Sequence, residues 1–164
     1  MAAARAKRRG AVGVVASAIL AGAALAQPAP SPRAPSVYAV VFTAQWCPNC
    51  RIADPAVRRA VGYVNNPALG TVWVDLTSER TWTASNQAVV DAGVDRVHNL
   101  YVTYTGLTVL TAADSGEPLG CLTRAQSDIA MAEAMRAALE RVRTFPAGRR
   151  GPLRPTCPPP RTDR

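Results

Sequence analysis

Residues 40–51 read VVFTAQWCPNCR, and they join a short apolar run to a Cys-x-x-Cys pair at the start of a helical pattern. The β-branched and aromatic residues of the run predict a buried strand. Cys47 is therefore expected at a helix N-terminus, where free N–H groups and the helix dipole favour a thiolate. Cys50 follows one helical turn later, close enough to form a disulfide with Cys47. Strand, Cys-x-x-Cys and helix in this order predict a thiol–disulfide exchange site.

The first 26 residues have the pattern of a secretory signal peptide. A basic segment (residues 5–9) precedes an uncharged apolar run (residues 10–25), and Ala24-Leu25-Ala26 forms a cleavage site. The run has 16 residues, whereas a membrane-spanning helix needs about 20. Cleavage and export to the periplasm or the outside of the cell are therefore expected, with no stable membrane insertion afterwards. The alternative is an uncleaved segment that anchors the chain to the membrane.

Most of the formal net charge of +8 lies at the two ends of the chain. Residues 34–145 hold nine arginines and ten acidic residues, so this part is about neutral. A nucleic-acid-binding domain needs a basic patch on its folded body, and none is visible, so no nucleic-acid partner is expected. The five arginines after Pro146 are interpreted as a solvated tail, with contact to anionic lipid or an acidic partner as the less favoured reading.

The composition predicts one domain between two low-complexity segments. Residues 27–35 form a Pro-rich linker after the signal peptide, and residues 146–164 form a Pro/Arg-rich tail. The roughly 110 residues between them, 36–145, are enough for one small hydrophobic core.

The hydrophobic pattern of this domain predicts an α/β fold. The expected strands are residues 36–43, 71–76, 107–112 and 117–122, and the expected helices are residues 48–64, 82–92 and 127–143. Two βαβ crossovers predict parallel pairing, and a final hairpin adds an antiparallel strand. We therefore expect a mixed sheet of four to five strands with helices on both faces, and the cysteine pair at its carboxyl edge.

Two of the expected helices have apolar faces that predict their buried sides. The first helix should bend at Pro55, because proline removes an N–H group and crowds the preceding turn. Ser127 is expected to cap the last helix. The residues expected on the apolar faces are Ile52, Val57, Val61 and Val64 in the first helix and Ile129, Ala132, Met135, Leu139 and Val142 in the last.

The segment from Phe42 to Cys50, the proline five residues after Cys50, and the final hairpin and helix resemble the thioredoxin superfamily. The resemblance covers about residues 36–143 and is closest to exported thioredoxin-like domains of disulfide-handling proteins, which share a stretch like residues 74–77. It implies a thioredoxin-like fold and an enzyme, a thiol–disulfide oxidoreductase without a cofactor. Cys47 would attack a substrate disulfide and Cys50 would resolve the mixed disulfide. The implied partners are protein thiols and disulfides and a redox partner protein.

The chain departs from the family pattern at two positions. The family's buried aspartate, which accepts the proton of the second cysteine, corresponds to Val41, so Cys50 must lose its proton to water or to another group. The family's cis-proline corresponds to Gly106-Leu107-Thr108, which contains no proline. Gly106 is expected to shape this loop. Residues 96–105 are longer than the family norm and are expected to form a lip over the site, with Tyr101 and Tyr104 as apolar contacts.

The residues expected to line the site are Trp46, Pro48, Asn49, Gly106 and Leu107. Trp46 and Trp73 are interpreted as packing residues, although Trp46, beside the nucleophile, also resembles the family's substrate-facing aromatic residue. Two alternatives to exchange chemistry stay open at this point. The pair could form a redox-inert disulfide, or a metal-carrying module could use the two thiolates as half of a tetrahedral site, although no metal ligand set is predicted. The lone histidine, His98, is expected to be solvent-exposed in a loop.

Cys121 and Cys157 are a possible second disulfide, which would pin the tail to the domain in an oxidising compartment. The alternative is a buried Cys121 thiol and a free Cys157, because pairing cannot be deduced from sequence. The direction of electron flow stays open too.

Overall fold

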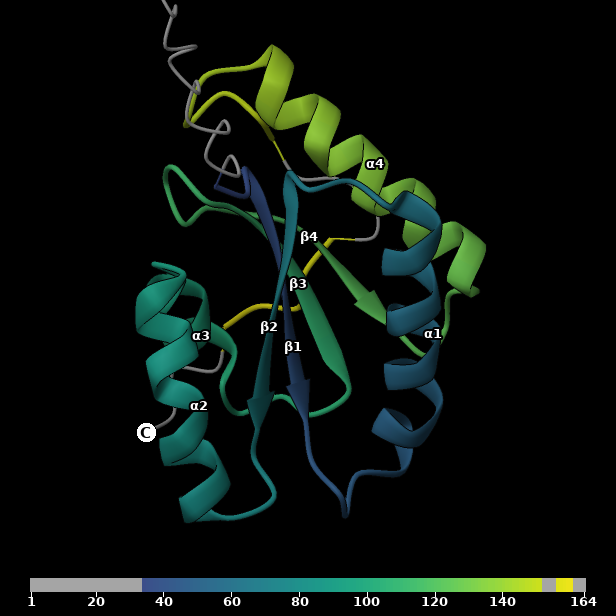
Figure 1. The fold of residues 1–164 in the computed structure, drawn as a ribbon, viewed down its shortest axis with the longest axis vertical. Coiled ribbons are helices and arrows are strands. Elements are labelled where there is room, and N and C mark those ends of the chain that lie inside the picture. The colour runs from purple at the N-terminus through teal and green to yellow at the C-terminus, as the bar shows by residue number, and fades with distance from the viewer. Residues whose placement is uncertain (1–33, 152–155, 161–164) are drawn as a thin grey trace, which may run out of the picture. The chain divides into compact units, whose positions relative to one another are not determined.

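The computed structural model describes residues 34–151 and 156–160, which fall in one compact unit (Figure 1). The expected signal peptide and most of the linker lie outside the described residues. The elements in chain order are β1 (Val37–Thr43), α1 (Pro48–Val64), β2 (Leu69–Asp75), α2 (Glu79–Asp91), α3 (Asp95–Tyr101), β3 (Leu107–Ala112), β4 (Pro118–Thr123) and α4 (Asp128–Thr144). Among the described residues, no helix is both long enough and apolar enough to span a membrane.

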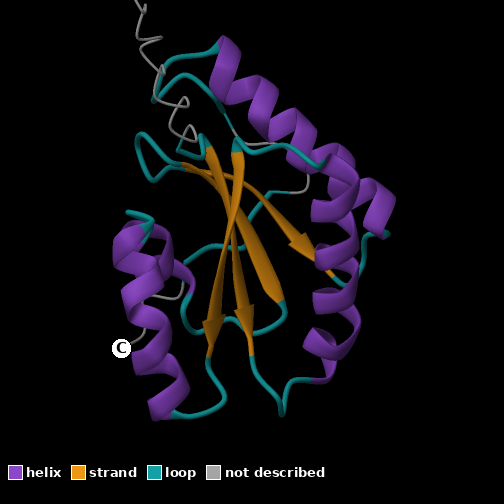
Figure 2. Cartoon of the chain, in the orientation of Figure 1, coloured by secondary structure: helices purple, strands orange, loops and turns teal. Residues whose placement is uncertain are grey.

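The four strands form one mixed sheet in the order β2-β1-β3-β4 (Figure 2). β1 pairs with β2 in parallel, and β3 is antiparallel to both β1 and β4. The α/β class, the mixed sheet and the final hairpin are confirmed. The expectation of a second parallel crossover is wrong, because β3 runs against β1.

A helix that the sequence pattern did not predict explains the direction of β3. Residues 96–105 were expected to form a lip, but most of them belong to α3 and the turn after it. α2 leads away from the edge where β2 ends, and α3 brings the chain back to that edge (Figure 1). β3 consequently starts beside the end of β1, where Leu107 pairs with Phe42 and the Gly106 N–H donates to the Phe42 carbonyl at 2.8 Å.

β1 is one of the two inner strands and has helices on both faces, as expected (Figure 1). Val37, Ala39 and Val41 pack with α1 and α4 on one face. Val40 and Phe42 pack on the other face with residues of α2, α3 and the turn between them. Because both faces of this strand are buried, its sequence is a continuous apolar run without polar alternation.

The bounds of α1 agree with the prediction, and the helix continues through Pro55. Its buried residues are mainly alanines, and α4, which packs in the same cluster, buries two alanines and two methionines. Small side chains let the two helices approach closely, since the distance between packed helices depends on the residues at the contact. The expected burial of Ile52 and Ile129 is wrong, because their side chains are 56% and 62% exposed. Ser127 caps α4 as expected, accepting the Ala130 N–H at 3.2 Å.

The first part of the tail folds back onto the domain. Arg150, expected to be solvated, is only 4% exposed, and its guanidinium donates two hydrogen bonds of 2.6 Å to the carboxylate of Asp114. Glu117 lies 3.4 Å from the same guanidinium and also accepts the Gly148 N–H at 2.9 Å. The Arg150 hydrogen bonds lower the pKa of Asp114 below its ordinary value. These contacts tie the segment after α4 to the β3–β4 turn.

Candidate redox-active site at the end of β1

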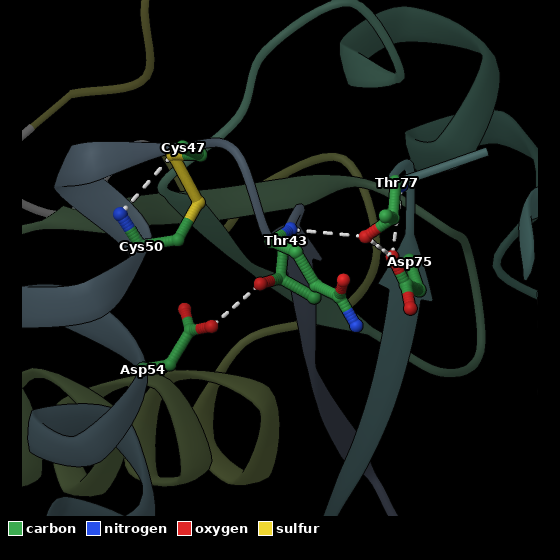
Figure 3. The surroundings of a disulfide bond; sticks show 7 residues. Thr43, Cys47, Cys50, Asp54, Asp75 and Thr77 are labelled. Carbon is green, nitrogen blue, oxygen red and sulfur yellow. Dashed lines mark hydrogen bonds between the residues drawn. A yellow bond between two sulfur atoms is a disulfide. The ribbon is translucent and has the colours of Figure 1, made fainter.

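Cys47 and Cys50 form a disulfide at the first turn of α1, where the chain leaves the carboxyl end of β1 (Figure 3). Their Cα atoms are 5.3 Å apart. Cys47 is the N-cap of the helix, and its Sγ accepts the Cys50 N–H at 3.1 Å. This N–H is one of the groups that the helix itself cannot satisfy, so it favours negative charge on Cys47 Sγ when the pair is reduced.

The two sulfurs are shielded, whereas the residue before them is exposed. Cys47 and Cys50 are 3% and 2% exposed and pack with Ala44 and the partly buried Leu76. Trp46 is 60% exposed, so its interpretation as a packing residue is wrong. Trp73 is half-buried, with the guanidinium of Arg58 3.9 Å from its ring centre. An exposed indole beside a cysteine offers apolar surface to a partner molecule.

Hydrogen bonds to the end of β2 hold the loop that carries Trp46. The Gln45 N–H donates to the Thr77 hydroxyl at 2.9 Å. The same hydroxyl donates to the carboxylate of Asp75, which also accepts the Thr77 N–H at 2.8 Å (Figure 3). This chain of bonds couples the two parallel strand ends and fixes the approach to Cys47.

Gly106 lies against the first turn of α1, in the loop that it was expected to shape. Its φ of +73° is in the left-handed region, and a Cβ at this position would lie 2.9 Å from the Cβ of Asn49. Pro48 is in the same first turn. Asn49, Gly106 and Leu107 all line one hollow of about 780 Å³ next to the disulfide-bearing turn. The structure thus brings these predicted site residues together.

The tail supplies the opposite side of this hollow. A disulfide joins Cys157 to Cys121 of β4, and Thr156, Cys157, Pro158 and Pro159 line the hollow. The Tyr104 hydroxyl donates to the Pro159 carbonyl at 2.7 Å. Tyr101 is 3% exposed in the core, so it does not form the expected lip. Of residues 96–105, Tyr104 and Thr105 line the hollow together with the tail.

Asp54 is a site residue that the sequence reasoning missed. It follows Cys50 by one helical turn, and its Oδ2 accepts a hydrogen bond of 2.5 Å from the Thr43 hydroxyl. Burial raises the pKa of Asp54, opposed by the Thr43 hydrogen bond and the positive charge of Arg58. The sequence signal that could have found it is the spacing of four residues between Cys50 and Asp54, because residues four apart in a helix share a face.

Val41, at the place of the family's aspartate, is 1% exposed and packs in the core. This position therefore supplies no proton acceptor.

His98 does not belong to the site. It is 8% exposed, so the expectation of a solvent-exposed loop histidine is wrong. Trp82 Nε1 donates to its Nε2 at 3.3 Å, and its ring centre lies 6.4 Å from that of Phe42. Within residues 34–151 and 156–160, no three His, Cys, Asp or Glu side chains are grouped so that they could hold a metal ion.

No protein-family model matches the chain, and no curated protein matches it by sequence. The assignment of a function therefore depends on the geometry of the site.

Proposed function

We propose that this protein is an exported thiol–disulfide oxidoreductase that exchanges disulfides with protein substrates. The observation that carries the proposal is the Cys47–Cys50 disulfide at the N-terminus of α1, with Cys47 as the helix cap. The order of elements and the β2-β1-β3-β4 sheet are compatible with a thioredoxin-like fold, in which a Cys-x-x-Cys pair occupies this place.

The exchange proceeds in two steps that balance without a cofactor. The Cys47 thiolate attacks one sulfur of a substrate disulfide, forms a mixed disulfide and releases the other substrate sulfur as a thiolate. Cys50 then attacks Cys47 Sγ, which breaks the mixed disulfide and forms the Cys47–Cys50 bond. The substrate gains two electrons and the cysteine pair loses two; a redox partner protein resets the pair.

One observation favours a second candidate, a binding module whose disulfide does not turn over. Both cysteines are almost fully buried, at 3% and 2% exposure, and a substrate disulfide must reach Cys47 Sγ in line with the bond that breaks. In this reading Trp46 and the neighbouring hollow bind a partner while the disulfide only holds the first turn of α1.

Trapping of the mixed disulfide separates the two candidates. The Cys50→Ala variant keeps the nucleophile and lacks the resolving thiol. It should therefore accumulate mixed disulfides with model proteins that contain disulfides, such as insulin. The matched Cys47→Ala variant should accumulate far fewer. Both variants keep Cys121 and Cys157, so the second disulfide is the same in each. Mass spectrometry of the adducts identifies the cysteine that carries the substrate.

A wild-type protein that does not accelerate insulin reduction, together with equal trapping by the two variants, would establish the binding module instead. A result in which only Cys50→Ala is trapped would support exchange at Cys47.

A further inference from the structure

We propose that Asp54 is the acid–base partner of Cys50. Its carboxylate takes up the thiol proton when Cys50 attacks, and returns a proton when the Cys47–Cys50 disulfide is opened by reduction. As a step in exchange, this role rests on the proposed function; as a coupling between two ionisable groups, it can be measured without turnover.

Position brings the two groups together. Cys50 and Asp54 are four residues apart in α1, so their side chains occupy neighbouring places on one face of the helix. Both line a hollow of about 350 Å³ at the end of β1. Figure 3 shows one carboxylate oxygen bonded to Thr43 and the other on the side that faces the turn carrying Cys50. A hollow of this size has room for a bridging water molecule.

One oxygen of Asp54 is buried without a hydrogen bond. Oδ2 accepts the Thr43 hydroxyl, but Oδ1 is buried and has no partner among the described residues. A buried oxygen without a hydrogen bond is unfavourable and rare in folded proteins, so its presence calls for an explanation. In the disulfide form Cys50 has no S–H to donate. Reduction creates an S–H donor on Cys50, which lines the same hollow as Asp54, and in this proposal Oδ1 accepts from it directly or through one water.

The surroundings suit a group that gains and loses a proton. The charged groups lining the hollow besides Asp54 are Arg51 and Arg58 of α1 and Asp75 of β2. Burial favours the neutral acid, while the Thr43 hydrogen bond and Arg58 favour the carboxylate. The net result is a pKa of Asp54 above its ordinary value, which makes the carboxylate a better proton acceptor than an exposed one.

The resolving step then balances as follows. The Cys50 thiol passes its proton to Asp54, directly or through one water, as its sulfur forms a bond to Cys47 Sγ. The bond between Cys47 and the substrate sulfur breaks, and the substrate sulfur leaves with the electron pair. Asp54 releases its proton to the leaving thiolate or to solvent.

The first measurement does not need a substrate. In Cys47→Ser protein with the Cys121–Cys157 disulfide intact, the ultraviolet absorbance of the thiolate reports ionisation of Cys50 as a function of pH. A neighbouring carboxylate disfavours the thiolate, so adding Asp54→Asn should lower the midpoint by about one pH unit. The matched control is Asp128→Asn, an acid paired with Arg59 at the start of α4, which should leave the midpoint unchanged. An unchanged or raised midpoint with Asp54→Asn overturns the proposal.

The second measurement follows exchange with an aromatic disulfide that releases a coloured thiolate. Attack by Cys47 releases the first thiolate, and resolution by Cys50 releases the second. Asp54→Asn should leave the first phase unchanged and slow the second at least tenfold at neutral pH. The difference should vanish in alkaline buffer, where hydroxide removes the thiol proton.

The outcomes separate this inference from the proposed function. The role of Asp54 in resolution is contradicted if the second phase is as fast in Asp54→Asn as in wild type at neutral pH. It is also contradicted if the second phase of Asp54→Asn is slower than wild type by the same factor at every pH. A wild-type protein that releases no thiolate contradicts the proposed function, and the Cys50 ionisation curve then still decides whether the two groups are coupled.

Discussion

Gly106 and Asn49 are in van der Waals contact across the candidate site, so that a Cβ at residue 106 would lie 2.9 Å from the Asn49 Cβ. The neighbouring Cys50 nitrogen would be 3.5 Å away. The loop before β3 is therefore packed directly on the turn of α1 that carries both cysteines. This contact makes the shape of the loop and the position of the disulfide interdependent.

Gly106→Ala should destabilise the protein by about 1–3 kcal/mol, because alanine is strained at a φ of +73° and its methyl group displaces Asn49. The control is Gly62→Ala, at an exposed position of α1 with no atom within 4 Å of the added methyl group. That change should stabilise by about 0.5–1 kcal/mol, since alanine is the better helix former. Urea unfolding curves measure both. Equal midpoints for the two variants would show that Gly106 has no special constraint.

Trp46→Ala should slow exchange with protein substrates about five- to tenfold and leave stability within about 0.5 kcal/mol of wild type. The indole is 60% exposed beside Cys47, so it contributes contact area to a partner but little to the core. Rates with insulin and with a small disulfide give the comparison, and only the insulin rate should fall. Ile129→Ala, another exposed apolar residue, serves as the control. The role of Trp46 in substrate contact is contradicted if Trp46→Ala and Ile129→Ala have the same rates with insulin and with the small disulfide.

Cys157→Ser should lower the free energy of unfolding by about 2–4 kcal/mol, because the Cys121–Cys157 disulfide links residues 36 apart and restricts the unfolded chain. Tyr104→Phe removes the hydroxyl that donates to Pro159 and should cost about 1 kcal/mol. Thermal unfolding in non-reducing buffer measures both losses. A Cys157→Ser protein as stable as wild type would mean that this disulfide does not hold the tail in solution.

Arg150→Gln should destabilise the protein by about 1–2 kcal/mol at neutral pH, a modest loss because the Asp114 side chain is 53% exposed and water screens the pair. The pKa of Asp114 is lowered in the folded protein, so the pair stabilises the fold above the ordinary pKa of 3.8. This contribution is lost as pH falls through the lowered folded value.

The stability difference between wild type and Arg150→Gln should therefore be constant from neutral pH to about pH 5 and shrink below about pH 4. Arg143→Gln, which breaks a fully exposed pair with Glu140, should have a much smaller effect than Arg150→Gln at every pH. Denaturant unfolding across the pH range checks both. A pH-independent difference at acid pH would contradict the contribution of Asp114.

Several features of the fold follow from local pattern alone. β1 was predicted because a short run of β-forming residues leads to a helix start, and α1 has the predicted bounds because Pro48 and Asn65 mark its ends. The β3–β4 hairpin followed from its turn residues, and Ser127 caps α4 through a bond to a residue only three positions away. Features that depend on residues close together in the sequence can therefore be predicted from it.

Other features depend on partners that are distant in sequence. The antiparallel direction of β3 was missed because α3 is short and lacks an extended apolar period. The burial of Arg150 depends on Asp114, 36 residues away, and no local pattern distinguishes it from the other arginines of the tail. The exposure of Ile52 and Ile129 reflects which helix faces meet the sheet and each other, which periodicity locates only approximately.

The amino-acid sequence alone determined the element that carries the cysteines: residues 40–51 specify a strand, a Cys-x-x-Cys pair and a helix start through local preferences. The tertiary structure decided what surrounds that pair. It brought Gly106 onto the first turn of α1 and set Thr43 against Asp54, leaving one buried oxygen of this acid without a partner. Backbone preferences act between near neighbours, so they can be predicted from the sequence. The environment of a sulfur is set by packing between segments that are far apart in the chain.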